Sequence, residues 1–153
     1  MSRIIRDAIV SALRRVDGIG TVHDRERYAA RQEDFRRLYM DEAGIVKGWF
    51  VALDARAESR PALGRHNVTY RWRLHGYRSF DDEVRSEILF AQALEAVAAA
   101  LRADDTLGGT VFDISAPSGD ETGLQIDTVE AVMFAGVLCH QARCRLTTRS
   151  LLG

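Results

Sequence analysis

The sequence contains little that would cross-link or rigidify the chain. It has only two cysteines and two prolines in 153 residues. Cys139 and Cys144 lie five positions apart in one predicted strand, and an odd separation places two side chains on opposite faces of a strand. We therefore expect two reduced cysteines and no disulfide between them.

An excess of charge of one sign is also missing. The chain carries 21 basic and 22 acidic residues, for a net charge of −1, which gives no overall attraction to nucleic acid or to a membrane surface. No apolar run approaches the roughly 20 residues that span a bilayer. The start of the chain, Met1–Arg6, lacks the apolar centre of a signal peptide. We expect the protein to be made and kept in a cytoplasm.

Motifs for metal binding or catalysis are absent as well. No histidine forms a paired zinc-ligand motif with another histidine or with a cysteine, a test applied to His23, His66, His75 and His140. The acidic run Asp81–Glu83 has a sufficient structural role at the start of a helix. The glycines at 18–20 and 108–109 do not stand between a strand and a helix, as a phosphate-binding loop would. We expect no metal, no cofactor and no catalytic residue.

The clearest positive signal is a long helix between Ser79 and Ala103. Ser79 is suited to the N-cap, and Asp82 completes a capping-box pattern. Apolar residues then recur at helical spacing, namely Phe90, Leu94, Val97 and Leu101. We expect this stripe to pack on a sheet.

The remaining pattern predicts an α+β fold: a single domain over residues 1–153, with a mainly antiparallel β-sheet, an N-terminal helix and the long helix packed on it. Beside the N-terminal helix at Arg3–Val16, a short helix is expected near the end of the charged stretch 24–37. Strands are expected at Ile19–His23, Ile45–Leu53, Arg65–Tyr77, Val111–Ile114, Ile126–Phe134 and Val137–Thr148. Prolines and glycines predict flexible loops at 54–64 and 115–123.

Two apolar features favour contacts with other molecules. The strand Ile45–Leu53, which includes Trp49 and Phe50, is apolar on both faces, and this favours a covered or oligomer-buried position. Ile88 and Leu89 point away from the apolar stripe of the long helix. We therefore treat these four residues as candidate subunit or partner contacts.

A third candidate surface is basic. Basic side chains share one face of each of two predicted strands: Arg71, Arg73 and His75 on the first, Arg143 and Arg145 on the second. If the strands are neighbours, these side chains form a positive patch that could meet an acidic protein surface or DNA phosphates. The alternative is the polar face of a half-exposed sheet, paired with the acidic loop Asp120–Glu121 or with the helix.

His140 lies on an apolar strand face, where a hydrogen-bonded core or interface histidine is commoner than a metal ligand. A nucleophile–base pair with the adjacent Cys139 is not expected, because neighbouring strand residues point to opposite faces.

Several stretches together resemble the tail-terminator (tail completion) proteins of long-tailed bacteriophages. These are the helix Ile4–Ile9 followed by Gly18–Gly20, the strand Tyr70–Tyr77, the helix Phe90–Leu101 leading into Leu107–Gly109, and the stretch Glu130–His140. The resemblance covers nearly the whole chain, as a pattern of elements rather than a catalytic signature.

The resemblance implies a structural virion protein and not an enzyme. Such proteins form a ring, typically a hexamer, on the head-proximal end of the tail tube, where the ring stops tube polymerisation and offers a surface to the neck of the capsid. The implied partners are further copies of the chain, the tail tube protein and the head–tail connector, with assembly in the host cytoplasm. Two alternatives remain open: another connector or neck protein, and a small oligomeric α+β enzyme or ligand-binding module, which would need a concave pocket with convergent polar groups.

Overall fold

The computed structural model describes residues 1–152. Five strands form one sheet in the order β1-β2-β3-β5-β4, in which β1 runs parallel to β2 and all other neighbours are antiparallel. The elements are α1 Ser2–Arg14, β1 Thr21–His23, α2 Gln32–Arg37, β2 Lys47–Ala62, β3 Arg65–Ser79, the 3₁₀ turn η1 Asp82–Val84, α3 Ser86–Ala103, β4 Gln125–Phe134 and β5 Val137–Leu152. The predicted α+β fold with a mainly antiparallel sheet is confirmed.

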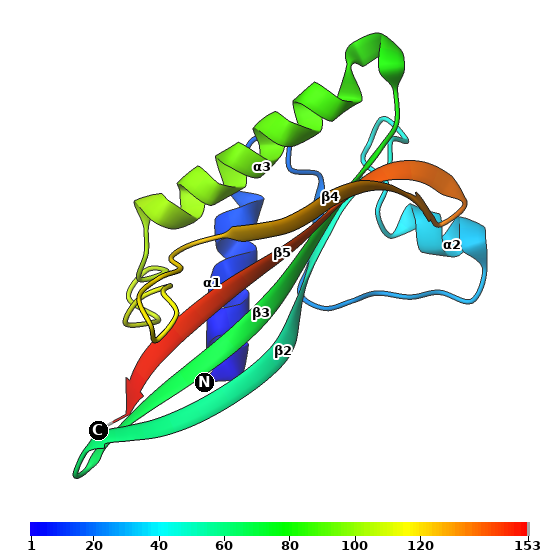
Figure 1. Ribbon diagram of the computed structural model, residues 1–153. Coiled ribbons are helices and arrows are strands. Elements are labelled where there is room, and N and C mark those ends of the chain that lie inside the picture. The colour runs from blue at the N-terminus through cyan, green and yellow to red at the C-terminus, as the bar shows by residue number, and fades with distance from the viewer. Residues whose placement is uncertain (153) are drawn as a thin grey trace.

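The main core lies between the sheet and the two long helices, α1 and α3 (Figure 1). The predicted α3 stripe is buried, and alternate residues of β3 and β5 meet it from the sheet. Trp72 and Leu146, which are cross-strand partners, are both fully buried in this core.

None of the helices among residues 1–152 has the length and hydropathy needed to span a bilayer.

The start of the long helix differs from the prediction. Ser79 ends β3 instead of capping a helix, and the chain turns through η1 before α3 begins at Ser86. The Asp81 carboxylate accepts a hydrogen bond from the Glu83 N–H and caps η1. The predicted acidic start is therefore a separate turn, and Arg85 in the left-handed conformation, at φ 55°, redirects the chain into α3.

A second, smaller core covers the opposite face of the sheet beside α2. Tyr39, Phe50 and Tyr77 are buried there, and Phe35 and Phe134 pack against them. Tyr77 stacks on Phe134 with ring centroids 3.8 Å apart. Burial raises the pKa of the Tyr39 hydroxyl to about 12. The strand that is apolar on both faces thus lies between two cores of the same chain.

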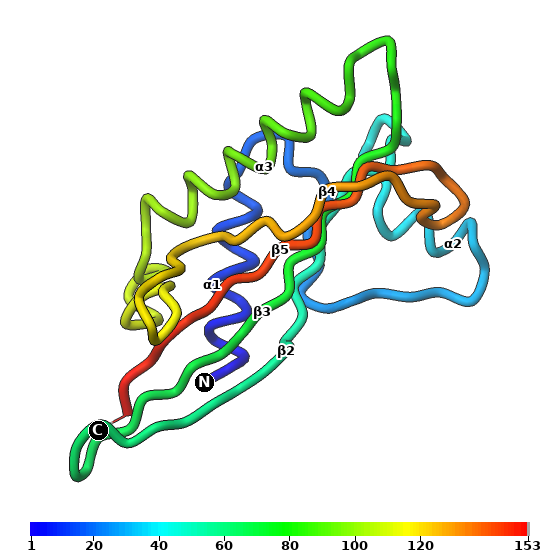
Figure 2. Tube along the Cα trace, in the orientation of Figure 1, coloured from blue at the N-terminus to red at the C-terminus, as the bar shows by residue number. Residues whose placement is uncertain are grey.

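The predicted loop at 54–64 is wrong, because β2 continues through Ala62. After a bulge at Leu53/Ala55, the ladder to β3 resumes with Ala55 opposite Arg71 and continues to Ser59 opposite Asn67. The result is a long β2–β3 hairpin whose tip projects beyond the helices beside the end of β5 (Figure 2). We call residues 54–66 the hairpin arm.

The predicted strand Val111–Ile114 is also wrong. Only Asp113 makes an isolated bridge, opposite Arg149, although Val111 and Ile114 are buried and close one end of the main core. Residues 115–123 form a loop, as predicted, and hydrogen bonds hold it, including one of 2.8 Å from the Ala116 N–H to the Glu121 carbonyl. The flexibility of this loop stays a prediction.

Candidate interaction surfaces

The five predicted basic residues do lie together on one face of the sheet. Arg73 stands opposite Arg145, and His75 stands opposite Arg143, in the ladder between β3 and β5. This face is opposite to the one that α1 and α3 cover, since the alternate residues Trp72 and Leu74 belong to the main core. The register therefore confirms the predicted neighbourhood of these side chains.

The charge of this face is mixed and not simply positive. Arg145 donates to both carboxylate oxygens of Asp127, at 2.8 and 2.9 Å, and to Glu121 at 3.0 Å. These hydrogen bonds hold the pKa of Asp127 below its usual range. Longer ion pairs join Arg143 to Glu130 at 3.7 Å and Arg73 to Glu26 and Asp54 at 3.6 and 3.8 Å.

Within residues 1–152, Arg71 is the one member of the group of arginines without a carboxylate within 4.0 Å. The ion pairs of Arg73, Arg143 and Arg145 agree with the alternative that the sequence left open, in which the polar face of the sheet is balanced by acidic neighbours. Phosphate binding needs several free cations, so this face offers little support for DNA binding.

His75 has the most strongly perturbed histidine pKa of this face, lowered to about 4. Burial is the main cause, and the positive charges of Arg73 and Arg143 act in the same direction. The ring packs on Phe50, with centroids 4.9 Å apart, and makes no hydrogen bond among the described residues. A perturbed histidine is a feature of catalytic sites, but here packing between two arginines explains it and no nucleophile adjoins it.

Trp49 and Phe50 are not available as contacts on the surface of the folded chain, because each is only 2% exposed. Trp49 covers Gly76 of β3 so closely that a Cβ atom at Gly76 would lie 2.4 Å from the indole ring. Phe50 belongs to the second core. The apolar character of both faces of this strand reflects internal packing, and the prediction that these two residues bind a partner is corrected.

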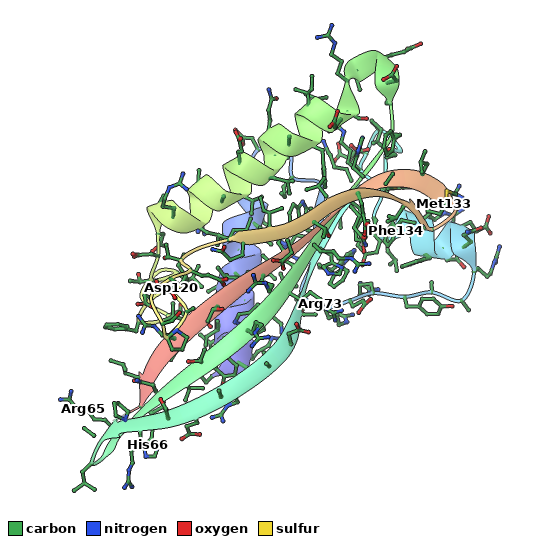
Figure 3. The ribbon with its side chains drawn as sticks, in the orientation of Figure 1. Arg65, His66, Arg73, Asp120, Met133 and Phe134 are labelled. Atoms are coloured by element: carbon green, nitrogen blue, oxygen red, sulfur yellow. The ribbon has the colours of Figure 1, made fainter. Side chains whose placement is uncertain are left out.

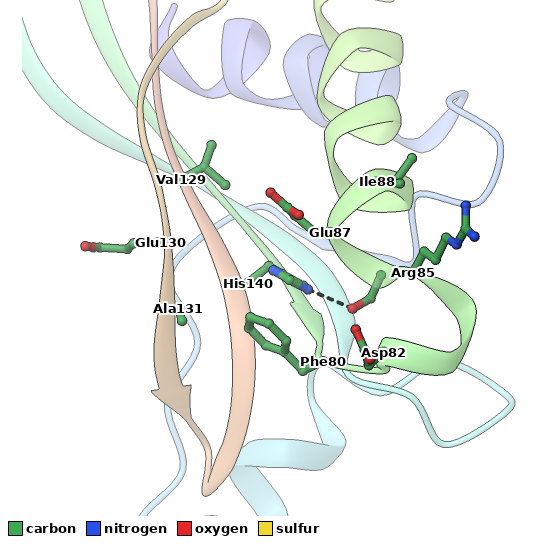
Figure 4. A pocket seen from close by; sticks show the side chains of 10 residues that line it. Phe80, Asp82, Arg85, Glu87, Ile88, Val129, Glu130, Ala131 and His140 are labelled. Carbon is green, nitrogen blue, oxygen red and sulfur yellow. Dashed lines mark hydrogen bonds between the residues drawn. The ribbon is translucent and has the colours of Figure 1, made fainter.

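Ile88 and Leu89, in contrast, are exposed as predicted, at 49% and 37%. Ile88 lines a cleft of about 430 Å³ between the start of α3 and strand β4 (Figure 4). Phe80 and Val129, also half-exposed, share this lining with the carboxylates of Asp82 and Glu87. We call it the α3–β4 cleft.

The floor of the α3–β4 cleft contains a serine–histidine pair. The Ser86 hydroxyl and His140 Nε2 are 2.8 Å apart (Figure 4). The Asp81 N–H donates to the same Ser86 oxygen at 3.0 Å. Phe80 stacks on the His140 ring at 3.6 Å. Burial lowers the pKa of His140.

This pair does not have the arrangement of a nucleophile and its base. Ser86 and His140 are 2% and 4% exposed, so a substrate cannot reach the hydroxyl. No carboxylate among the described residues bonds to His140 Nδ1 to orient the ring, as serine hydrolases require. The expectation of a hydrogen-bonded core histidine is confirmed, and the bond joins α3 to β5.

The two cysteines lie on opposite faces of one strand, as the sequence predicts. Cys139 lies in the second core and Cys144 in the main core, on opposite faces of β5, and both are free. Burial raises their thiol pKa values to about 11 and about 12, so neither is a thiolate at neutral pH. Within the described part of the chain, no group of three or more His, Cys, Asp and Glu residues could hold a metal ion.

Sequence reasoning missed the exposed side chains of β4. Val129 and Met133 lie on the helix side of the sheet, in line with His140 and Ala142 across the ladder, yet they are 51% and 68% exposed. The alternation in Ile126–Phe134 indicated a strand, but not that this strand would lie last in the sheet, beyond the cover of α3.

No protein-family model matches the chain, and no curated protein shows significant similarity to it.

Proposed function

We propose that this chain is a structural protein of a long-tailed bacteriophage that forms a ring on the head-proximal end of the tail tube. The ring ends tube polymerisation and offers a surface for head attachment. The resemblance to tail-terminator proteins supports the proposal, and the order of elements agrees with it: an opening helix, a long hairpin, a long helix and a second hairpin.

The observation that supports assembly best is the α3–β4 cleft. Three of its apolar side chains, Phe80, Ile88 and Val129, are each more than 40% exposed. Clustered apolar side chains rimmed by carboxylates are typical of protein interaction sites. The sheet face with the paired arginines favours a protein partner over DNA, because it offers few free cations for phosphate groups.

Tail length is the measurement that tests this proposal. Particles would be assembled with and without the gene and examined by negative-stain electron microscopy. Overlong, headless tails in its absence are the expected result, since nothing would then stop the growth of the tube. A wild-type copy supplied from a plasmid should restore tails of uniform length.

Two other outcomes contradict tail termination. Tails of normal length that fail to join heads would assign the protein to the head–tail connector. Complete, infectious particles would remove it from virion assembly altogether and return attention to a binding or enzymatic role.

A further inference from the structure

Strand β4 is an edge of the sheet that no part of the described chain covers. It pairs with β5 on one side, and no backbone group of residues 1–152 pairs with it on the other. From Thr128 to Phe134 the ladder is regular and contains neither lysine nor proline, the residues that commonly block such an edge. An open edge of this kind is a template for another strand.

Strand β2 offers a second open edge. Its neighbour β1 pairs only with Gly48, Trp49 and Phe50. From Val51 to Arg60 the outer side of β2 has no backbone partner within residues 1–152. Pro61 ends this stretch, since proline cannot donate a backbone hydrogen bond. The free stretch and β4 are of closely similar length.

The strand directions allow these two edges to meet. Each of the pairs β2–β3, β3–β5 and β5–β4 is antiparallel, so β4 runs opposite to β2. If β4 of one copy lay beside β2 of the next, the antiparallel alternation would continue from one sheet into the other. The helix-covered faces would then lie on the same side.

Side chains near the two edges differ in charge. The α3–β4 cleft beside β4 carries the carboxylates of Asp82 and Glu87 against a single arginine, Arg85. The hairpin arm carries three arginines, Arg56 and Arg60 of β2 and Arg65 of β3, against the two carboxylates of Asp54 and Glu58.

We propose that β4 of one copy pairs antiparallel with residues Val51–Arg60 of β2 in a second copy, so that neighbouring sheets become continuous. Because the two edges are different surfaces, the contact is head-to-tail, and a head-to-tail contact that closes generates a ring. The inference rests on the proposed ring assembly and names the contact that would build it.

The positions of the two edges fit a closed ring of sheets. Thr128 of β4 stands level, across β5 and β3, with Phe50 of β2, whereas the free stretch of β2 lies beyond Phe50 toward the arm. Met133 and the arm residues Arg65 and His66 accordingly lie toward opposite ends of the molecule (Figure 3). Pairing the edges displaces each copy along the strand direction, and such a stagger is what closure of a sheet into a barrel requires.

A mixing experiment with two blocked variants tests the contact. Val129→Lys blocks the β4 edge, and Ala57→Lys blocks the β2 edge; both residues are exposed, so each variant should fold. Masses would be measured by light scattering and native mass spectrometry. We expect the wild type to be oligomeric, each variant alone to be monomeric, and an equimolar mixture to form a 1:1 heterodimer through the one intact pair of edges. Ile4→Lys, at an exposed site on α1, is the matched control and should keep the wild-type mass.

The remaining outcomes separate this inference from the proposed ring. Wild-type mass in either blocked variant would overturn the edge pairing while leaving the ring in place. A mixture that stays monomeric, although the wild type is oligomeric, would show that the two edges do not bind each other. A wild type that is monomeric at all concentrations would overturn both the edge pairing and the ring.

Discussion

At the scale of single residues, the bond between Trp72 and Thr148 supports a sharp prediction. The Trp72 indole N–H donates to the Thr148 hydroxyl at 3.0 Å, and both side chains are fully buried. Thr148→Val keeps the shape but removes the acceptor, which leaves a buried donor without a partner. We expect a loss of about 1–3 kcal/mol in the free energy of unfolding, measured with urea.

The adjacent Thr147 supplies the control for that change. It points to the opposite, open face of the sheet and is only partly buried. Thr147→Val should alter stability by less than about 0.5 kcal/mol, as is usual for surface substitutions. Equal losses in the two variants would mean that the cost comes from replacing any threonine hydroxyl of β5, and not from the loss of the indole bond.

The His75 pKa predicts a pH dependence of stability. Its value of about 4 lies below the ordinary 6.5, so between these pH values the unfolded chain binds more protons than the folded one. The contribution of His75 to the free energy of unfolding is therefore complete well above pH 6.5, and it is lost as the pH drops toward 4. We expect His75→Gln to make this fall shallower in urea titrations repeated across the window.

Other titrating groups do not obscure that measurement. His23 and His140 also have lowered pKa values, but they remain in the variant and contribute equally to both proteins. Asp113 and Asp127 titrate below their ordinary value of 3.8, outside the window. Parallel curves for His75→Gln and wild type would show that His75 is protonated in the folded state as readily as in the unfolded one.

At the scale of elements, the sequence predicted the helices and strands that a local pattern determines. It missed those features that depend on pairing between distant strands. The stripe of α3 and the alternation of β3 are local, and both elements were found. Residues 55–59 include two alanines and a serine, which favour no strand, and become one because Arg71, Thr69 and Asn67 of β3 supply backbone partners. The exposed edge of β4 could not be predicted either, since strand order depends on contacts between distant segments.

The two faces of α3 predict opposite effects of one substitution. Leu94 is buried in the main core, whereas Leu89 is 37% exposed. Leu94→Asp should unfold the chain, because a carboxylate would be buried without a partner. Leu89→Asp should leave the thermal unfolding midpoint of the monomer within a few degrees of wild type but prevent assembly. Circular dichroism and light scattering measure the two effects, and unfolding of Leu89→Asp would place that residue in the core.

At the scale of the whole molecule, the sheet has one face covered by α1 and α3, an opposite face shared by the second core and the ion-paired arginines, and two open edges. The helices satisfy one side of the sheet, and the ion pairs of Arg73, Arg143 and Arg145 balance the other. What remains unsatisfied is backbone along β4 and the outer half of β2. Assembly through these edges would therefore complete the hydrogen bonding of the sheet without disturbing either face.

Such assembly predicts that heat stability depends on protein concentration. A contact present only in the folded state stabilises it by mass action, and each tenfold rise in concentration adds up to about 1.4 kcal/mol per protomer. For a chain of this size that corresponds to a rise of about 3–5 °C in the unfolding midpoint. Differential scanning calorimetry over two decades of concentration should show this rise for the wild type and for Ile4→Lys. A flat response is expected for Val129→Lys, and a wild-type rise in that variant would show that β4 takes no part in the contact.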